Sequence, residues 1–307
     1  MDGGADSLRE RCAHLPVMIR ETIACLDPRP GQVIVDCTVG EGGHAAAILP
    51  RIFPGGTLLG IDRDEEAIAG ARERMMNFNG NRVVFARDSF SQLPRVAAAL
   101  GFSQVDGVLF DLGASTRQFL DPVRGFSFRQ AGPLDMRMDR REETTAADLV
   151  NRLPPPELER IIAEFGGERW AKRISRAIQR ERGRSPIRTT DRLAAVVARA
   201  VPGRGRIHPA TRTFQALRIV LNRELEELER GLAAALALLR PGGRICVIAF
   251  HSLEDRIVKQ AFRAWKRTGA AELLTARPLR PSWEEERANP RSRSARLRAA
   301  VKAAGGG

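Results

Sequence analysis

Carboxylates and glycines alternate in the part of the chain with the clearest chemical meaning. An apolar run over 33–35 ends in Asp36 and opens into a glycine-rich turn over 40–44, and a second apolar run over 57–61 ends in Asp62. A strand, a glycine turn, a helix and a second strand ending in an acid are typical of nucleotide sites at the carboxyl ends of parallel strands. The glycines let the backbone approach a ligand, and the carboxylate of Asp62 can accept hydrogen bonds from both hydroxyls of a ribose.

The charges of this turn indicate which nucleotide it binds. Gly40, Gly42 and Ala45 match the dinucleotide pattern, so a nicotinamide cofactor is one alternative. A pyrophosphate, however, needs bare N–H groups at a helix N-terminus, whereas Asp36 and Glu41 place two carboxylates there. S-adenosylmethionine has an ammonium and a sulfonium that these carboxylates attract. The turn therefore favours S-adenosylmethionine, and a simple connection between strand and helix is the alternative without a ligand.

Further polar groups follow the next two predicted strands. Asp88 and Phe90 come after the third strand, where an acid can accept from an adenine amine and a ring can cover the adenine face. A helix N-cap followed by a core phenylalanine explains the same residues equally well. Asp111 ends the fourth strand and faces the crevice of an open sheet, so it is a candidate for direct contact with cofactor or substrate. A buried aspartate that caps a turn is the alternative.

The last strand ends in a histidine that is also a candidate for substrate contact. His251 follows an apolar run over 244–250. Ser252 and Asp255 stand three residues apart directly after it and match a capping box, which favours a structural role for this pair.

These residues require a parallel sheet to bring them together. Strands are expected over 32–37, 57–62, 82–86, 105–112 and 244–250, and helices over 44–52, 65–77, 91–100 and 214–239. Strands alternating with helices predict an α/β, doubly wound, Rossmann-like sheet. The alternation stops between 119 and 212, where short helical segments are broken by prolines and glycines. The sequence therefore predicts a sheet domain in two parts, 1–118 and 213–307, interrupted by an inserted helical domain over 119–212.

Composition excludes several classes of protein. The chain has 307 residues, of which 43% are hydrophobic, and no apolar run approaches the roughly 20 residues that cross a bilayer. The N-terminus has no apolar segment of the signal-peptide kind. The cysteines and histidines are scattered without ligand spacing, so no metal site is predicted: Cys12, Cys25, Cys37, Cys246, His14, His44, His208 and His251. Reduced, unpaired cysteines favour a cytoplasmic protein.

The positive charge is concentrated in the predicted insertion. The net charge is +13, and residues 169–212 hold 13 Lys or Arg against Glu181 and Asp191. Arg169, Arg173 and Arg176 recur at helical spacing, opposite an apolar stripe. A segment of almost one sign is the electrostatic footprint of a polyanion, and nucleic acid is the partner it favours. An arginine-rich surface from a GC-rich genome and an anionic membrane are the alternatives.

Several motifs together resemble the MraW-like 16S ribosomal RNA (cytosine-N4)-methyltransferases. They are HLPV at 14–17, DCTVGEGGH at 36–44, RGFSF at 124–128, GPLDMRMD at 132–139, HPATRTFQALRI at 208–219, FHSLEDR at 250–256 and NPRSRS at 289–294. The resemblance runs from His14 to about Arg298. It departs from the family at 114–120, where ASTRQFL stands in place of a VSSPQLD-like stretch.

The resemblance implies a class I methyltransferase sheet with an inserted helical domain for RNA. It implies S-adenosylmethionine bound by Gly42, Gly43, His44, Asp62, Phe90, Asp111 and Gln118. It also implies methylation of N4 of a cytosine in the decoding region of 16S ribosomal RNA, within a small subunit that is assembled or nearly so.

The catalytic residues are less well defined, because the Pro-Pro-aromatic motif of many amino-methyltransferases is absent. The candidates are Asp111, Asp135, Asp139 and His251. With no tyrosine in the chain, Phe126, Phe128 or Trp170 would have to stack on a base, and all three are equally plausible core residues. A nicotinamide-dependent oxidoreductase and a non-catalytic assembly factor remain alternatives. The sequence leaves the oligomeric state open, and a homodimer is compatible with it.

Overall fold

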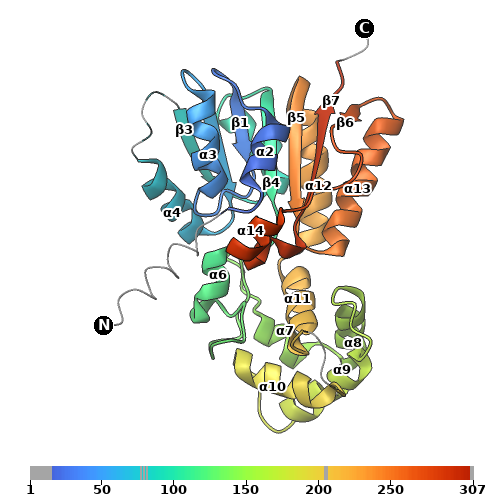
Figure 1. Ribbon diagram of the computed structural model, residues 1–307. Coiled ribbons are helices and arrows are strands. Elements are labelled where there is room, and N and C mark those ends of the chain that lie inside the picture. The colour runs from blue at the N-terminus through green and yellow to red at the C-terminus, as the bar shows by residue number, and fades with distance from the viewer. Residues whose placement is uncertain (1–15, 77, 79, 81, 204–206, 305–307) are drawn as a thin grey trace. The chain divides into compact units, whose positions relative to one another are not determined.

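The chain folds into two compact units. The computed structural model describes residues 16–76, 78, 80, 82–203 and 207–304 (Figure 1). Cys12 and His14 lie outside these ranges. The first unit combines Met1–Gly113 with Leu225–Gly307, and the second unit is the continuous segment Ala114–Glu224.

A seven-stranded sheet forms the centre of the first unit. Its strands are β1 (Val33–Asp36), β2 (Thr57–Asp62), β3 (Arg82–Arg87), β4 (Val105–Asp111), β5 (Leu239–Ala249), β6 (Ala271–Leu273) and β7 (Arg296–Lys302). They lie in the order β3-β2-β1-β4-β5-β7-β6. Strands β1 to β5 are parallel, and β7 is antiparallel to β5 and β6. The chain reverses its winding between β1 and β4, and ligands of open α/β sheets bind at such a switch point.

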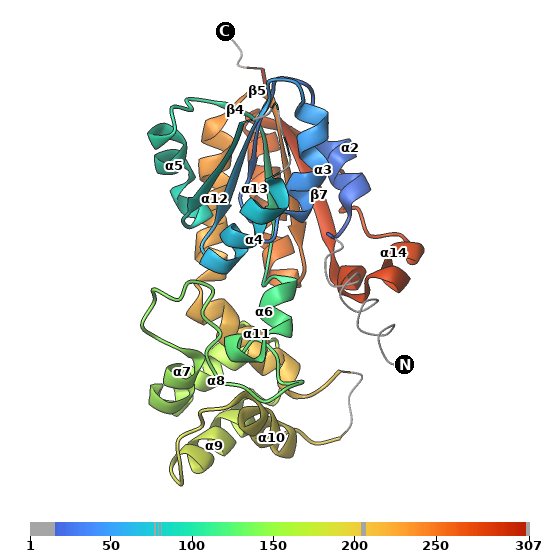
Figure 2. The ribbon, with the colours of Figure 1, turned by 90° about the vertical axis from the view of Figure 1, so that its left-hand side faces the viewer.

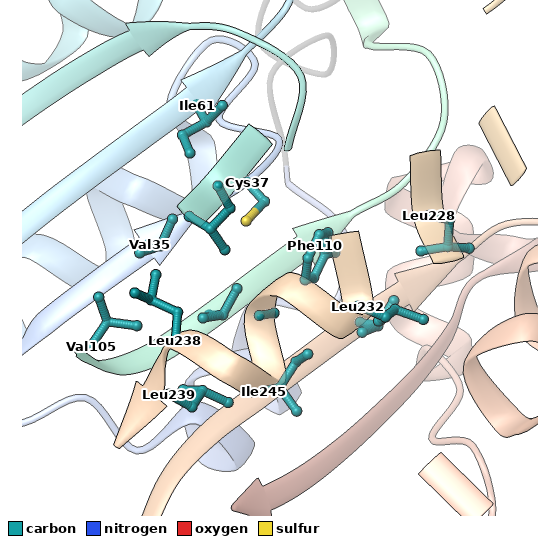
Figure 3. Close-up of a cluster of buried hydrophobic side chains, with 14 of the residues drawn as sticks. Val35, Cys37, Ile61, Val105, Phe110, Leu228, Leu232, Leu238, Leu239 and Ile245 are labelled. Atoms are coloured by element: carbon teal, nitrogen blue, oxygen red, sulfur yellow. The ribbon is translucent and has the colours of Figure 1, made fainter. Parts of the chain in front are cut away.

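Helices cover both faces of this sheet, and each face has its own apolar core. They are α2 (Ile19–Leu26), α3 (Gly43–Ile52), α4 (Glu65–Met75), α5 (Leu93–Ala99), α12 (Glu224–Leu238), α13 (Ser252–Arg267) and α14 (Trp283–Ala288), with 3₁₀ turns η1 (Phe90–Gln92) and η3 (Pro290–Ser294). Figure 2 shows α5 and α12 on one face and α2 and α3 on the other. On the first face, Phe110 and Val35 from the sheet pack against Leu232 of α12 (Figure 3).

The second unit is helical. It contains α6 (Thr116–Leu120), η2 (Pro122–Arg124), α7 (Ala146–Arg152), α8 (Pro155–Glu164), α9 (Ala171–Arg182), α10 (Thr190–Ala200) and α11 (Ala210–Leu221). Its apolar core includes Ile162, Ile174, Leu193 and Leu217. The predicted fold class, an α/β doubly wound sheet with a helical insertion, is confirmed. In the described part of the chain, no helix is both long enough and apolar enough to cross a membrane.

The predicted helix over 214–239 is wrong, and the compact second unit, Ala114–Glu224, extends beyond both predicted bounds of the insertion, 119 and 212. The helix is interrupted between α11 and α12, where Arg223 has a positive φ of 51°. The Asn222 side chain fixes this break, since it accepts from Met138 N at 2.8 Å and donates to Met136 O at 2.9 Å. Helix α11 packs in the core of the second unit, so that unit continues to Glu224.

Strand β5 also begins earlier than the predicted residue 244, since it includes Pro241, Gly242 and Gly243. Its pairing with β4 shifts register there, from Val105 opposite Leu239 to Gly107 opposite Arg244. The glycines of this stretch are thus accommodated as an irregularity within the strand.

Candidate cofactor and catalytic site

Three acids end three adjacent strands of the first unit. Asp62 ends β2, Asp36 ends β1 and Asp111 ends β4. Because these strands are parallel and neighbours in the order β2-β1-β4, the three carboxyl ends share one edge of the sheet. The three acids singled out in the sequence therefore lie together at the carboxyl ends of the strands.

The glycine turn after β1 is tied to Asp62. One carboxylate oxygen of Asp62 accepts from Gly40 N at 3.0 Å, and the other accepts from Asp64 N at 2.9 Å. Gly42 is the N-cap of α3 with a φ of 78°, and a Cβ at this position would lie 2.7 Å from Met75 Cε. The turn therefore depends on glycine for its conformation and for its close approach to α4.

Thr38 joins the ends of β1 and β4. Its hydroxyl accepts a hydrogen bond from Asp111 N at 2.6 Å, and its N–H donates to an Asp36 carboxylate oxygen at 3.2 Å. The residue between them continues the connection, since Cys37 N donates to Leu109 O at 2.9 Å. Two of the three acids are thus positioned by one short loop.

His44 is buried in the first turn of α3 and lies against Asp111. Its Nε2 is 2.9 Å from Val17 O, so this nitrogen carries the proton and donates. The other nitrogen, Nδ1, lies 3.5 Å from a carboxylate oxygen of Asp111. Burial lowers the pKa of His44. In the neutral ring Nδ1 is an acceptor, so it and Asp111 attract each other only when His44 holds a second proton or the carboxyl of Asp111 is protonated.

The acids of this edge hold their protons unusually strongly. Burial raises the pKa of Asp36 to about 7 and that of Asp62 to about 6. Burial, assisted by the charge of Glu254, raises the pKa of Asp111 to about 7. One oxygen of Asp111, Oδ1, is buried and has no hydrogen-bond partner among the described residues. A ligand that brings positive charge to this edge would stabilise all three carboxylates, and the sulfonium and ammonium of S-adenosylmethionine meet that requirement.

Phe90 lies beside the same edge at the start of η1. Its ring meets Phe110 edge to face, with centroids 5.4 Å apart. A Cβ at Gly231 of α12 would lie 2.5 Å from the ring, so the helix approaches it closely. Asp88 is not the N-cap here: Ser89 caps η1, and Asp88 pairs with Arg95. Phe90 is thus fixed in position by packing, while the second expected adenine contact, Asp88, already has a cationic partner.

His251 follows β5 and is the N-cap of α13. Its Nδ1 accepts from Glu254 N at 3.3 Å, and a Glu254 carboxylate oxygen accepts from His251 N at 3.1 Å. The capping box is therefore His251 with Glu254, and the predicted box of Ser252 with Asp255 is wrong. Asp255 instead pairs with Arg296 at 3.0 Å and Arg298 at 2.7 Å on β7.

The remaining predicted site residues belong to the second unit. Gln118 is buried and closes a capping box, because its Oε1 accepts from Ser115 N at 3.0 Å. Asp135 receives hydrogen bonds of 2.8 Å from both Nε and Nη2 of Arg137. Asp139 is paired in the same manner with Arg141. A cofactor role for Gln118 stays a prediction, and each of the two aspartates has an arginine of its own two residues later.

The aromatic residues predicted to stack on a base differ in exposure. Phe126 is buried, and Phe128 packs against Phe214 with centroids 4.9 Å apart. Trp170 is half-buried, with the guanidinium groups of Arg169 and Arg173 at 5.1 and 5.6 Å from its ring. Phe126 and Phe128 are therefore core residues, while Trp170 is part of the basic surface.

Sequence reasoning missed four residues that position the site: Val17, Thr38, Glu254 and Glu285. Val17 holds His44, Thr38 holds Asp111, and Glu285 accepts from Met18 N at 2.6 Å. Thr38 could have been found, because a hydroxyl inside a strand-to-glycine turn commonly bonds to backbone. The contact of Glu285 joins positions 267 residues apart, and no local pattern indicates it.

Comparison with known proteins identifies the family of this chain. The model of the MraW methylase family matches residues 11–303. The chain belongs to this family. Ribosomal RNA small subunit methyltransferase H of Symbiobacterium thermophilum is 50% identical, with 94% of this chain and 96% of that protein covered. The proteins of the same name from Pelobacter propionicus and Thermomicrobium roseum are also 50% identical, over 94% and 95% of this chain and 98% and 94% of their own.

This MraW family member is thus a methyltransferase, and the predicted cofactor, S-adenosylmethionine, is confirmed. The nicotinamide alternative is wrong, as the two carboxylates of Asp36 and Glu41 indicated. The fit of the cofactor to the site rests on this acidic edge. It holds three carboxyls whose pKa values are raised, and a buried oxygen of Asp111 that accepts no hydrogen bond from the residues that the structure describes.

Proposed function

We propose that this protein methylates N4 of a cytosine in the decoding region of small-subunit ribosomal RNA, with S-adenosylmethionine as the methyl donor. The relatives that are 50% identical over nearly the whole chain carry the name of a small-subunit ribosomal RNA methyltransferase. The observation that supports an amine as the methyl acceptor is Asp111, a half-buried acid at the carboxyl end of β4. Its buried Oδ1 has no hydrogen-bond partner among the described residues.

Asp62, Gly42 and Asp36 are the residues that we assign to the cofactor. Asp62 keeps acceptor capacity for ribose hydroxyls, because a carboxylate has about four lone-pair sites and the backbone occupies two of them. Gly42 and Gly43 open α3 without side chains. Asp36 supplies negative charge beside them. The bound cofactor supplies an electrophilic methyl group on a sulfonium.

Asp111 is the residue that we assign to the target amine. The exocyclic nitrogen of cytosine is a poor nucleophile, since its lone pair is delocalised into the ring. An acceptor for one of its hydrogens lets the nitrogen pyramidalise, and placing that acceptor in advance lowers the barrier. Asp111 Oδ1 can take this hydrogen bond, and Thr38 holds the Asp111 backbone in place. Burial raises the pKa of Asp111 to about 7 in the free protein, so its carboxylate is a better proton acceptor than that of an exposed aspartate.

Helix α9 of the second unit is the surface that we assign to RNA. Lys172, Arg173, Arg176 and Arg180 are exposed along it, while Ile174 and Ile178 on its other face are buried in the unit's core. The acid of the helix, Glu181, pairs with Arg192 and Arg199 on α10. The exposed face therefore keeps its positive charge, which suits a phosphate backbone.

The reaction can be tested directly. Purified protein, labelled S-adenosylmethionine and small subunits that lack the modification should give N4-methylated cytidine in a nucleoside digest. Label on C5, on a ribose hydroxyl or on protein would contradict the assigned chemistry. Transfer to no ribosomal particle would contradict the proposed substrate.

A further inference from the structure

The C-terminal part of the first unit exposes apolar and basic side chains together. Trp283 is 65% exposed, Leu274 is 42% exposed and Leu279 is 37% exposed. The same stretch holds five exposed arginines: Arg277, Arg280, Arg287, Arg291 and Arg293. A large exposed aromatic ring is costly to keep in water, and a patch of such side chains commonly marks an interaction surface.

Trp283 is held on an ordered support. It is the first residue of α14, whose N-cap Ser282 accepts from Glu285 N at 3.2 Å. The helix ends at the buried Asn289, whose carbonyl accepts from the buried Ser292 hydroxyl at 2.8 Å. The ring is thus exposed because its surroundings place it there, and a rigid ring loses little entropy when a ligand stacks on it.

An arginine lies over the ring. The guanidinium of Arg287 is 4.6 Å from the centroid of Trp283, at the spacing of a cation–π contact. A planar cation beside an exposed indole is a combination that binds unpaired nucleobases, because the ring stacks on the base and the cation faces the phosphate.

This surface borders the cofactor edge of the same unit. Turn η3 leads directly into β7, whose first residue, Arg296, pairs with Ala249 at the carboxyl end of β5. Glu285 of α14 accepts from Met18 N at 2.6 Å, and the carbonyl of the preceding Val17 accepts from His44. Figure 1 likewise shows α14 at the end of the sheet where β5 finishes. Two hydrogen bonds therefore connect this helix to the loop that we assign to the cofactor.

We propose that Trp283, with Arg287 beside it, is a stacking platform for an unpaired base of the RNA substrate near the target cytosine. This proposal rests on the proposed function. It adds a contact on the sheet unit to the phosphate contacts of α9. Arg280 and Arg291, exposed in the same stretch of the chain, add positive charge that suits the adjoining phosphate backbone.

The test compares full-length variants on small subunits that lack the modification. Stacking of a base is worth ~1–3 kcal/mol, so Trp283→Ala should raise KM for the subunits about 5- to 150-fold. Trp283→Phe keeps a ring and should recover most of the loss. The matched control is Phe53→Ala, another ring of the first unit that is 50% exposed and follows α3 at its far end; its KM should stay at the wild-type value.

Further measurements separate the alternatives. Cofactor affinity and melting temperature should be the same in Trp283→Ala and wild type, because the ring is exposed. A loss of either in step with KM would make Trp283 part of the scaffold and overturn the platform. Deproteinised small-subunit RNA should also bind the alanine variant more weakly; equal binding would assign the surface to a ribosomal protein.

The outcomes also distinguish this proposal from the proposed function. A wild type that methylates the subunits while Trp283→Ala has an unchanged KM would overturn the platform alone. A wild type that neither binds the RNA nor transfers a methyl group would overturn both. Loss of binding to anionic phosphatidylglycerol vesicles in Trp283→Ala, with RNA binding unchanged, would assign the surface to a membrane.

Discussion

Cofactor affinity should weaken as the pH falls from about 7 to about 5.5. Burial gives Asp36 and Asp111 a pKa of about 7 in the free protein. A cofactor with a sulfonium favours the ionised carboxylates, so it must displace any proton that they hold. For one such carboxyl the ionised fraction falls about 16-fold over this range, or ~1.6 kcal/mol, and for two independent carboxyls the factor is about 250.

Titration calorimetry measures this effect in two ways. The dissociation constant should rise by at least about 16-fold between the two pH values. Binding near pH 7 should also release protons, which is seen by repeating the titration in buffers of different ionisation enthalpy. An α-amino group keeps its proton over this range, so the ligand's ammonium does not cause the change. S-adenosylhomocysteine lacks the sulfonium charge and should depend less on pH.

The same carboxyls also make the stability of the ligand-free protein depend on pH. A carboxyl whose pKa is raised on folding adds stability below its unfolded pKa of about 4, and this contribution is lost as the pH rises through the folded pKa of about 7. Asp111→Asn removes one such group and with it this loss. The melting temperature of the variant minus that of wild type should therefore increase as the pH rises from 5.5 to 7. The variant's cofactor affinity should also depend less on pH. Affinity that is constant, or tighter at pH 5.5, would refute the reasoning.

Two further predictions concern the ribose and the RNA. Asp62→Ala should cost roughly 1.5–3 kcal/mol of cofactor affinity, as for hydrogen bonds to a charged group, with the fold retained; calorimetry that gives the wild-type affinity would remove Asp62 from the site. Reversal of Arg173, Arg176 and Arg180 to Glu should weaken RNA binding and flatten its dependence on salt while cofactor binding is unchanged; an equal slope of log K against log salt in the triple variant would contradict the assignment of α9 to RNA.

The strand-end acids could be predicted from the sequence because local geometry determines them. Asp36, Asp62 and Asp111 each follow an apolar run, and parallel strands bring such positions to one edge. The arginines of α9 were equally predictable, since helical spacing alone places Ile174 inside and Arg173 outside.

Other features depended on distant contacts and could not be predicted. The sequence at 251–255 fits two capping boxes, one offset from the other by a residue. The choice depends on β7, where Arg296 and Arg298 pair with Asp255 and so leave the cap to His251. No proline or glycine marks the end of α11. The hydrogen bonds that stop this helix run from Asn222 to a loop more than eighty residues earlier, so no local pattern indicates them.

The choice of the acid that receives the amine hydrogen depends on what each carboxylate already binds. Burial alone would raise the pKa of Asp135, but the hydrogen bonds and charge of Arg137 outweigh it and lower that pKa. An acid held in this way is a weak proton acceptor, and a new donor must compete with a bidentate guanidinium. Asp111 differs on both counts, since its pKa is raised to about 7 and its Oδ1 has no hydrogen-bond partner among the described residues. A donor reaching Oδ1 satisfies a buried oxygen and displaces nothing, and therefore an amine gains more from Asp111 than from Asp135.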